Sequence, residues 1–215
     1  MRFLRRYPNA VVAFALAALL ALAGFMLLPP ETSNADGPAP AAAGGSTPFG
    51  QWQRGVVPLL LQTDLQWAEV HYADGTMKTH GCGPTCLSMV YIGLTGKKDL
   101  DPASMAAYSE NQGYVDSGIT SWLLMGAGAQ QLGLQVRELS PNAGVVASEL
   151  AAGRPIICSV GPGDFTTEGH FIVLAGMSAD GRLIVHDPNS AERSSRAWDA
   201  DQVLSQCLNL WSYYV

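Results

Sequence analysis

The sequence predicts an α+β protein in which helices come first along the chain and antiparallel strands follow. Three observations support this fold class. Hydrophobic residues make up 48% of the 215 residues and charged residues 14%, which is typical of a folded globular chain. Helical patterns with capping residues occupy much of residues 82–152. After Gly153 the pattern changes to short β-rich runs separated by turn residues.

Four helices are expected before Gly153. The first begins at or just after Cys82, where a Gly-rich stretch passes into a helical pattern and Pro84 suits the first turn. The other three are indicated by N-cap residues, by proline at a first helical position, or by closing glycines. Their expected ranges are 102–113, 120–132 and 145–152.

Strands are expected mainly in the last third of the chain. Upstream of the helices, residues 56–62 form an apolar run with Pro58 near its edge, which suits a strand or an extended segment. A hairpin turn is expected at 179–182, and one or two helical turns between 199 and 206. The strands themselves are expected at 155–160, 171–176, 183–187 and 208–215.

The first fifty residues predict a membrane-targeting segment followed by a linker. Three arginines precede an unbroken apolar stretch over 10–28, and a helix of that length rises about 28 Å, close to the hydrocarbon thickness of a bilayer. Residues 1–28 are therefore expected to be an uncleaved signal anchor or a signal peptide. Residues 29–50, rich in Pro, Ala and Gly, form a linker. The positive-inside rule makes residues 51–215 an extracytoplasmic domain.

Charge argues against nucleic acid as a partner. Beyond residue 50 there are nine basic and sixteen acidic residues, without a run of Lys or Arg. This balance favours neutral or cationic substrates. No metal or cofactor is expected, because the spacing of His80, Cys82 and Cys86 matches no common zinc pattern. His71 and His80 are expected to be surface or loop residues.

Cys82 is the candidate nucleophile. A helix N-terminus lowers the pKa of a thiol, because unpaired N–H groups and the helix dipole stabilise the thiolate. Gly81 and Gly83 leave the backbone bare, so that a substrate carbonyl can approach and a main-chain N–H can point at a developing oxyanion. A buried structural cysteine is the alternative interpretation.

His170 and Asp187 are the candidate base and orienting group that a cysteine nucleophile requires. His170 stands at the start of one expected strand, and Asp187 closes the next. A four-residue turn between these strands would pair Met177 with Arg182. Asp187 then lies diagonally beside His170 on one face of the sheet, and His186 points to the other face. A one-residue change of register would reverse this placement.

Three sequence blocks occur in order along the chain. They are GCGPTxLxM at 81–89, GHFIVL at 169–174 and DPN at 187–189, with QxDxxW at 62–67 upstream. Together they resemble the cysteine peptidases related to the bacteriocin-processing, double-glycine leader peptidases, in the stand-alone "peptidase-like" branch. The resemblance covers nearly all of residues 56–215.

This resemblance implies a papain-like fold, with N-terminal helices packed on a C-terminal antiparallel sheet. It implies that Cys82 is the nucleophile, His170 the general base and acid, and Asp187 the residue that orients the imidazole. Gln62 takes the family's oxyanion role, which suits a side-chain amide N–H. The implied activity is hydrolysis of a peptide or related amide bond through a thioester. Cys86 departs from the family, which more often has a small residue there.

Two other interpretations use the same residues. One is a thiol acyltransferase or a cell-wall amidase, and the other is a noncatalytic binding module of the cell envelope. The expected partner is thus a peptide or a cell-envelope substrate. Trp122, Trp198 and Trp211 are expected mainly in the core, although one of them could line a substrate groove. Two of the cysteines 86, 158 and 207 could form a disulfide, but the sequence does not identify the pair.

Overall fold

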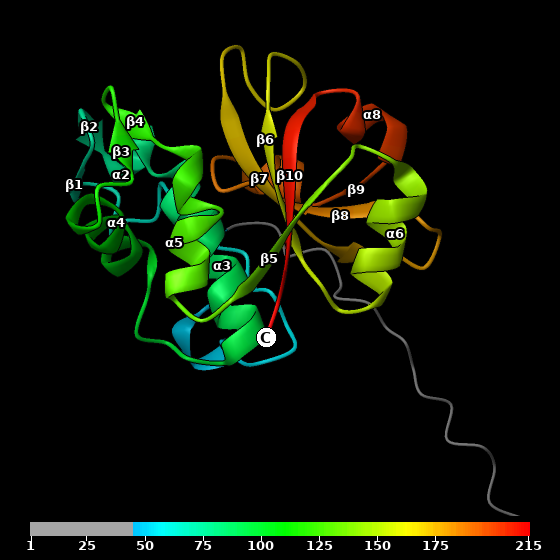
Figure 1. Cartoon of the computed structure of the whole chain (residues 1–215), viewed down its shortest axis with the longest axis horizontal. Coiled ribbons are helices and arrows are strands. Elements are labelled where there is room, and N and C mark those ends of the chain that lie inside the picture. Colours follow the sequence, from blue (N-terminus) through cyan, green and yellow to red (C-terminus); the bar gives the residue numbers. More distant parts are fainter. Residues whose placement is uncertain (1–44) are drawn as a thin grey trace, which may run out of the picture. The chain divides into compact units, whose positions relative to one another are not determined.

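A computed structural model describes residues 45–215 of the protein (Figure 1). They combine helices with a six-stranded antiparallel sheet, which confirms the α+β class. The membrane segment predicted at 1–28 and most of the linker predicted at 29–50 lie outside the described residues. Within 45–215, no helix has the length and apolar character needed to cross a membrane.

The sheet has the strand order β5-β10-β6-β7-β8-β9, and all neighbours in it are antiparallel. The four predicted strands are present as β6, β7, β8 and β10. The edge strand β5 was not predicted, because its residues are mostly exposed and lack an apolar run. The strands are β5 (Gln135–Leu139), β6 (Ile156–Val160), β7 (His170–Met177), β8 (Leu183–His186), β9 (Ala197–Trp198) and β10 (Cys207–Tyr214).

Helices α3 and α6 cover opposite faces of the sheet, because alternate residues of each strand point to opposite sides. Ile157 and Val173 pack in the cluster that contains α3, and Ile172 packs in the cluster that contains α6. The helices are α2 (Met77–His80), α3 (Cys82–Thr95), α4 (Pro102–Asn111), α5 (Ala127–Gln131), α6 (Ala143–Ala151), α7 (Ala191–Ser194) and α8 (Ala200–Leu204), with 3₁₀ turns η1 (Phe49–Gln51) and η2 (Trp122–Leu124).

Capping residues explain where the predicted helices begin. The side chain of Asp101 accepts a hydrogen bond from the backbone N–H of Ser104 at 2.7 Å and starts α4 where predicted. Asn142 caps α6 in the same way, so this helix begins two residues before the predicted start at Val145. Helix α3 begins at Cys82, as expected, and its residues 83–93 are all buried. Packing along nearly the whole helix thus fixes the position of α3, and with it the position of Cys82 at its first turn.

The single helix predicted over 120–132 is wrong. The chain instead completes a hairpin between β3 (Val115–Asp116) and β4 (Ile119–Thr120), forms η2, and only then enters α5. Gly126, between η2 and α5, has φ −98° and ψ −89°, which is not a helical conformation. A second small hairpin, β1 (His71–Tyr72) with β2 (Gly75–Thr76), precedes α2.

The β7–β8 hairpin differs from the prediction at its turn but not at its far end. Met177 pairs with Leu183 rather than with Arg182, so the turn has one residue more than predicted. A β-bulge at Ala175 takes up this extra residue, and Val173 then pairs with His186, as the predicted register requires. The bulge therefore leaves Asp187 on the same face of the sheet as the first residue of β7.

The folded part begins before residue 51, where the domain was predicted to start. Thr47 donates its backbone N–H to the Leu59 carbonyl at 2.7 Å, and its hydroxyl accepts from the Leu59 N–H at 3.0 Å. The hydroxyl of Ser46 accepts from the N–H of Leu61 at 3.0 Å. Residues 46–47 thus hold the extended segment 56–61, in which no strand longer than an isolated bridge forms.

Candidate active site

Cys82 is the first residue of α3, and its side chain is partly exposed. Burial would raise the pKa of its thiol, but the His170 side chain and the backbone N–H groups of Phe171 on β7 and Gly83 at the helix start lower it. Cys86, one turn later, is fully buried. Of the two cysteines on this helix, only Cys82 therefore offers its sulfur to the pocket described below.

The glycines beside Cys82 are required by close packing. A Cβ atom on Gly81 would lie 2.4 Å from the Met77 carbonyl oxygen, and one on Gly83 would lie 2.6 Å from the Thr120 side chain. The chain itself therefore occupies the space that a side chain at either position would need. Their small size lets α2 and Thr120 pack close to Cys82.

His170 and Asp187 meet at the end of the β7–β8 hairpin. The Nε2 atom of His170 lies 2.8 Å from Oδ1 of Asp187, whose side chain is fully buried. Asp187 Oδ1 also accepts from the Asn189 N–H at 2.8 Å, and Oδ2 accepts from Nε of Arg193 at 2.5 Å. Burial alone would raise the pKa of Asp187, but His170, Arg193 and Asn189 lower it. Asp187 is thus held as a carboxylate.

The environment favours a charged pair of Cys82 and His170. Burial acts against both charges, since it raises the pKa of Cys82 and lowers that of His170. Their mutual hydrogen bond and attraction, with Asp187 on the far side of the ring, outweigh burial. The pKa of Cys82 is lowered as a result, and that of His170 is raised to about 9. This arrangement favours a thiolate on Cys82 beside an imidazolium on His170.

Gln62 follows the extended segment 56–61 and is buried. Its Nε2 donates to the Lys78 carbonyl at 2.8 Å, while its Oε1 is buried without a partner in the described structure. Its backbone N–H donates to the Pro188 carbonyl at 2.7 Å, which joins it to the loop after Asp187. Gln62 is not among the residues that line the pocket, and one of its two amide hydrogens is already engaged. Its oxyanion role stays a prediction.

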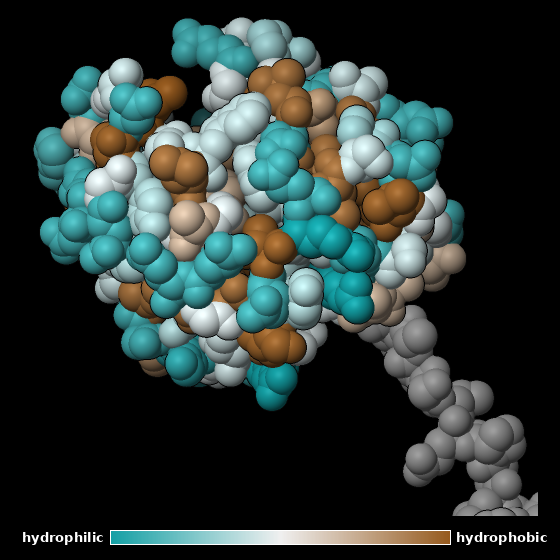
Figure 2. Space-filling view, viewed as in Figure 1, coloured by the Kyte–Doolittle hydropathy of each residue, from teal (hydrophilic) through white to brown (hydrophobic). Residues whose placement is uncertain are grey.

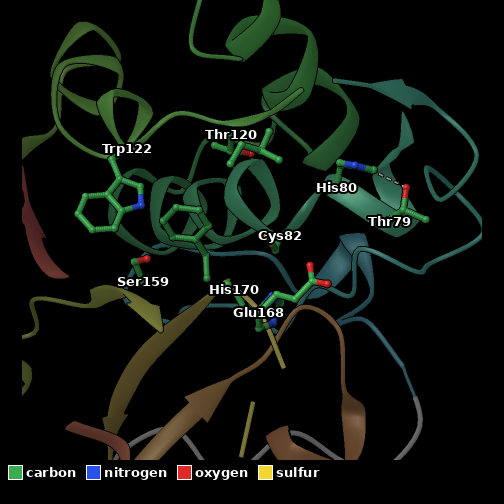
Figure 3. A pocket seen from close by; sticks show the side chains of 11 residues that line it. Thr79, His80, Cys82, Thr120, Trp122, Ser159, Glu168 and His170 are labelled. Carbon is green, nitrogen blue, oxygen red and sulfur yellow. Dashed lines mark hydrogen bonds between the residues drawn. The ribbon is translucent and has the colours of Figure 1, made fainter. Parts of the chain in front are cut away.

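A pocket of about 420 Å³ opens over Cys82 and His170 (Figure 3). Trp122 lies at one end of it, and His80 with Glu168 toward the other, with Cys82 between them. Figure 2 shows a notch in the surface between the part that carries the β3–β4 hairpin and the part above β6 and β7. The pocket is lined by Thr79, His80, Cys82, Ile119, Thr120, Trp122, Ser159, Glu168, Gly169, His170 and Phe171.

Several lining residues were not predicted as part of the site. His80 was expected on the surface or in a loop, but it lies at the end of α2 with Nδ1 2.8 Å from the Thr79 hydroxyl. Trp122 is 47% exposed and forms a wall of the pocket, whereas Trp198 and Trp211 are buried as expected. Arg193 was also missed, because no local motif connects it to Asp187.

The other cysteines lie away from the pocket. Cys86 and Cys158 are fully buried and Cys207 is partly buried, and all four cysteines of the described chain are free thiols. No disulfide is therefore present between any of the three candidates. In residues 45–215 no cluster of three His, Cys, Asp or Glu side chains is placed to hold a metal ion.

His186 is a second buried histidine beside the site. It is 3% exposed, and its Nδ1 has no hydrogen-bond partner in the described structure. Burial lowers its pKa to about 4, although a hydrogen bond to the Pro58 backbone opposes this shift. His186 is thus neutral at physiological pH, in contrast to His170.

Acidification is expected to destabilise the fold through His186. The pKa of an ordinary histidine is 6.5 and that of His186 in the fold is about 4, so the unfolded chain binds the proton first as the pH falls. The contribution of His186 is complete above pH 6.5, decreases as the pH falls from 6.5 to 4, and is lost below pH 4. The full loss is about 3 kcal/mol in the free energy of unfolding.

Urea unfolding at pH 7 and pH 4.5 measures this loss. Between these two pH values, His186→Gln should lose less stability than the wild type. Equal losses would contradict the assignment.

The comparisons with known proteins bear on the family of this chain. The sequence profile of the Peptidase C39-like family matches residues 56–215. The peptidase domain of Streptococcus ComA, a bifunctional ABC transporter involved in a quorum sensing pathway, is 21% identical, with a TM-score of 0.49 over 66% of this chain and 96% of that chain. A Bacillus anthracis protein described as a C39-like peptidase is 16% identical, with a TM-score of 0.45 over 75% of this chain and 96% of that chain. A search of curated proteins found no match.

The family profile covers most of the chain, and the matched segment contains Cys82, His170 and Asp187. The likeness to the two solved structures adds no further argument, because their sequence identities and TM-scores are low. The match of the profile is sufficient by itself, and the chain belongs to the Peptidase C39-like family.

Proposed function

We propose that the protein is a cysteine peptidase that hydrolyses a peptide or related amide bond through a thioester on Cys82. The observation that carries this proposal is the chain of contacts from Cys82 to His170 and from His170 to Asp187. It joins a thiol of lowered pKa to a protonated imidazole and to a buried carboxylate. A nucleophile, an acid and an orienting group therefore meet at one pocket, as covalent catalysis of acyl transfer requires.

The proposed reaction has two steps. In the first, the Cys82 thiolate attacks the substrate carbonyl carbon, and His170 donates its proton to the leaving amine as the C–N bond breaks. In the second, neutral His170 takes a proton from water as the water oxygen attacks the thioester carbon. The C–S bond then breaks, and the thiolate and imidazolium are restored. Asp187 holds the ring through Nε2 in both steps, which leaves Nδ1 for Cys82.

An oxyanion forms in each step and needs hydrogen-bond donors. We assign this role to the backbone N–H of Cys82 at the start of α3, together with the second amide hydrogen of Gln62. The buried position of Gln62 and its bond to the Lys78 carbonyl fix the amide group in one orientation. Gln62→Glu is expected to be less active than wild type, because it removes the donor and adds an acceptor.

We further propose that residues 51–215 act outside the cytoplasm on a peptide or cell-envelope substrate. The support is the basic and then apolar sequence of residues 1–28, followed by the Pro- and Ala-rich stretch. A protease added to intact spheroplasts should digest the domain. Protection until the membrane is lysed would contradict this location.

Alkylation of each cysteine as a function of pH tests the catalytic proposal. An ordinary thiol with a pKa of about 8.5 is only about 0.3% thiolate at pH 6. We expect Cys82 to react with iodoacetamide at pH 6 at least about ten times faster than such a thiol. His170→Ala should abolish this advantage, because the charged partner is lost. Mass spectrometry of the peptides measures each cysteine separately, and Cys207, which is partly buried, serves as the internal reference.

The opposite result would favour the binding-module interpretation. If Cys82 reacts like Cys207 at every pH, and does so equally in wild type and His170→Ala, the ion pair does not exist. A hydrolase that relies on it would then be excluded.

A further inference from the structure

The loop between β6 and β7, residues 161–169, is fixed at its outer part. The Asp164 carboxylate accepts hydrogen bonds from Gln202 at 3.0 Å and from Gln206 at 2.8 Å, both on or next to α8. Phe165 is buried, and its ring centroid lies 4.7 Å from that of Trp198. The last residues of the loop therefore return to β7 from a fixed position, and they end at His170.

Glu168 lies on this returning part and lines the pocket. Its backbone N–H donates to the Thr166 hydroxyl at 3.1 Å, which shapes the turn before β7. Its side chain extends toward the pocket near Cys82, below His80 (Figure 3). No ion-pair partner of Glu168 is present among residues 45–215.

The charges around the pocket leave this carboxylate unbalanced. Among the lining residues, Glu168 is the only carboxylate, and none is a lysine or an arginine. The charge of the His170 imidazolium is already matched by Cys82 and Asp187. An incoming positive group would therefore find one free negative partner at this end of the pocket.

The other end of the pocket is apolar. The Trp122 ring packs edge to face on Trp211, with centroids 5.6 Å apart and planes at 81°, so the buried ring supports the exposed one. Ile119 of the β3–β4 hairpin is 60% exposed and lines the same pocket. A substrate in this pocket meets an apolar wall and a carboxylate on different sides of Cys82.

We propose that Glu168 binds a positively charged side chain of the substrate, so that the enzyme prefers peptides with lysine or arginine close to the cleaved bond. This rests on the proposed function, because Cys82 defines which bond is cleaved. Trp122 accepts the apolar part of the same peptide. The preferred substrate is thus a peptide in which a basic residue and an apolar residue flank the scissile bond on opposite sides.

The test uses synthetic decapeptide mixtures with a phenylalanine at the centre. The flanking positions carry Lys, Gln or Glu in equal amounts, and mass spectrometry of the fragments identifies the cleaved bond. Individual Lys, Gln and Glu peptides of that sequence then give kcat/KM. We expect the Lys peptide to be cleaved about five times faster than the Gln peptide and the Glu peptide to be slowest, a ratio within reach of a partly exposed ion pair. High salt should reduce the ratio.

Two variants of Glu168 and one control locate the effect. Glu168→Gln should bring the Lys-to-Gln ratio close to one, and Glu168→Lys should favour the Glu peptide. Asp180→Asn removes one negative charge from the β7–β8 turn, outside the pocket and away from the Glu168 loop, so it should keep the wild-type ratio. Melting temperatures show whether each variant is folded.

The outcomes separate the two proposals. A wild-type ratio near one, or an unchanged ratio in Glu168→Gln, overturns the role of Glu168 but leaves peptide hydrolysis standing. A reactive Cys82 without cleavage of any Lys peptide overturns the substrate class alone. Failure to cleave every peptide, together with ordinary reactivity of Cys82, overturns the proposed function as well.

Discussion

Cys82→Ala is expected to reduce peptide hydrolysis by at least about 10³-fold, because it removes the only group that can form the thioester. The fold should persist, since the side chain is partly exposed at the first residue of α3. The measurement is kcat/KM on a cleaved peptide, with the melting temperature measured in parallel.

Cys86→Ala is the matched control for this prediction. It removes a thiol from the same helix, one turn further along, but from the core. We expect it to lower stability by about 1 kcal/mol and to keep most of the activity. Equal loss of activity in both variants would mean that disturbance of α3, and not the loss of a nucleophile, causes the effect.

Asp187→Asn is expected to reduce kcat by about 10²-fold to 10³-fold at neutral pH. The neutral amide keeps the shape of the side chain but no longer stabilises the imidazolium, and it leaves the Arg193 side chain without its carboxylate. The pKa of His170, about 9 in the wild type, should therefore fall. Because hydrolysis needs His170 protonated, the wild-type rate should decline as the pH rises through about 9. The alkaline limb of the variant should lie at lower pH.

Asp180→Asn provides the control for Asp187→Asn. Asp180 lies in the turn of the same hairpin and pairs with Arg182 at 2.7 Å, but it is exposed and far along the strands from the pocket. We expect unchanged kcat and an unchanged pH profile. A profile of Asp187→Asn that matches the wild type would contradict the orienting role of Asp187.

Much of the fold could be predicted because the sequence marks its own element ends. Asp101 is the N-cap of α4 and Pro102 is its first residue. The apolar runs of β6, β7 and β8 are separated from one another by turn residues. The failure at 120–132 has a physical cause. Apolar residues follow one another there, which favours a helix, but the backbone at Gly126 is not helical and interrupts it.

The candidate site was predicted only in part. Strand alternation was enough to bring His170 and Asp187 together, whereas Cys82 was assigned from its place at a helix start and from the family resemblance. The contacts of Arg193 and Glu168 depend on the paths of loops outside the sheet. Hydrophobic periodicity predicts helices and strands, but it does not predict the path of a loop. One feature of the sequence could have pointed to Glu168, namely its position two residues before the candidate base His170.

The bulge at Ala175 has a consequence for insertions and deletions in the β7–β8 hairpin. Without it, Asp187 would be opposite Val173, and its carboxylate would be on the wrong side of the sheet from His170. The extra turn residue and the extra strand residue therefore compensate each other, and a change in one requires a change in the other. If a relative gains or loses one residue in the turn, it must also gain or lose one in a strand. Only then do the imidazole and the carboxylate keep the same contact.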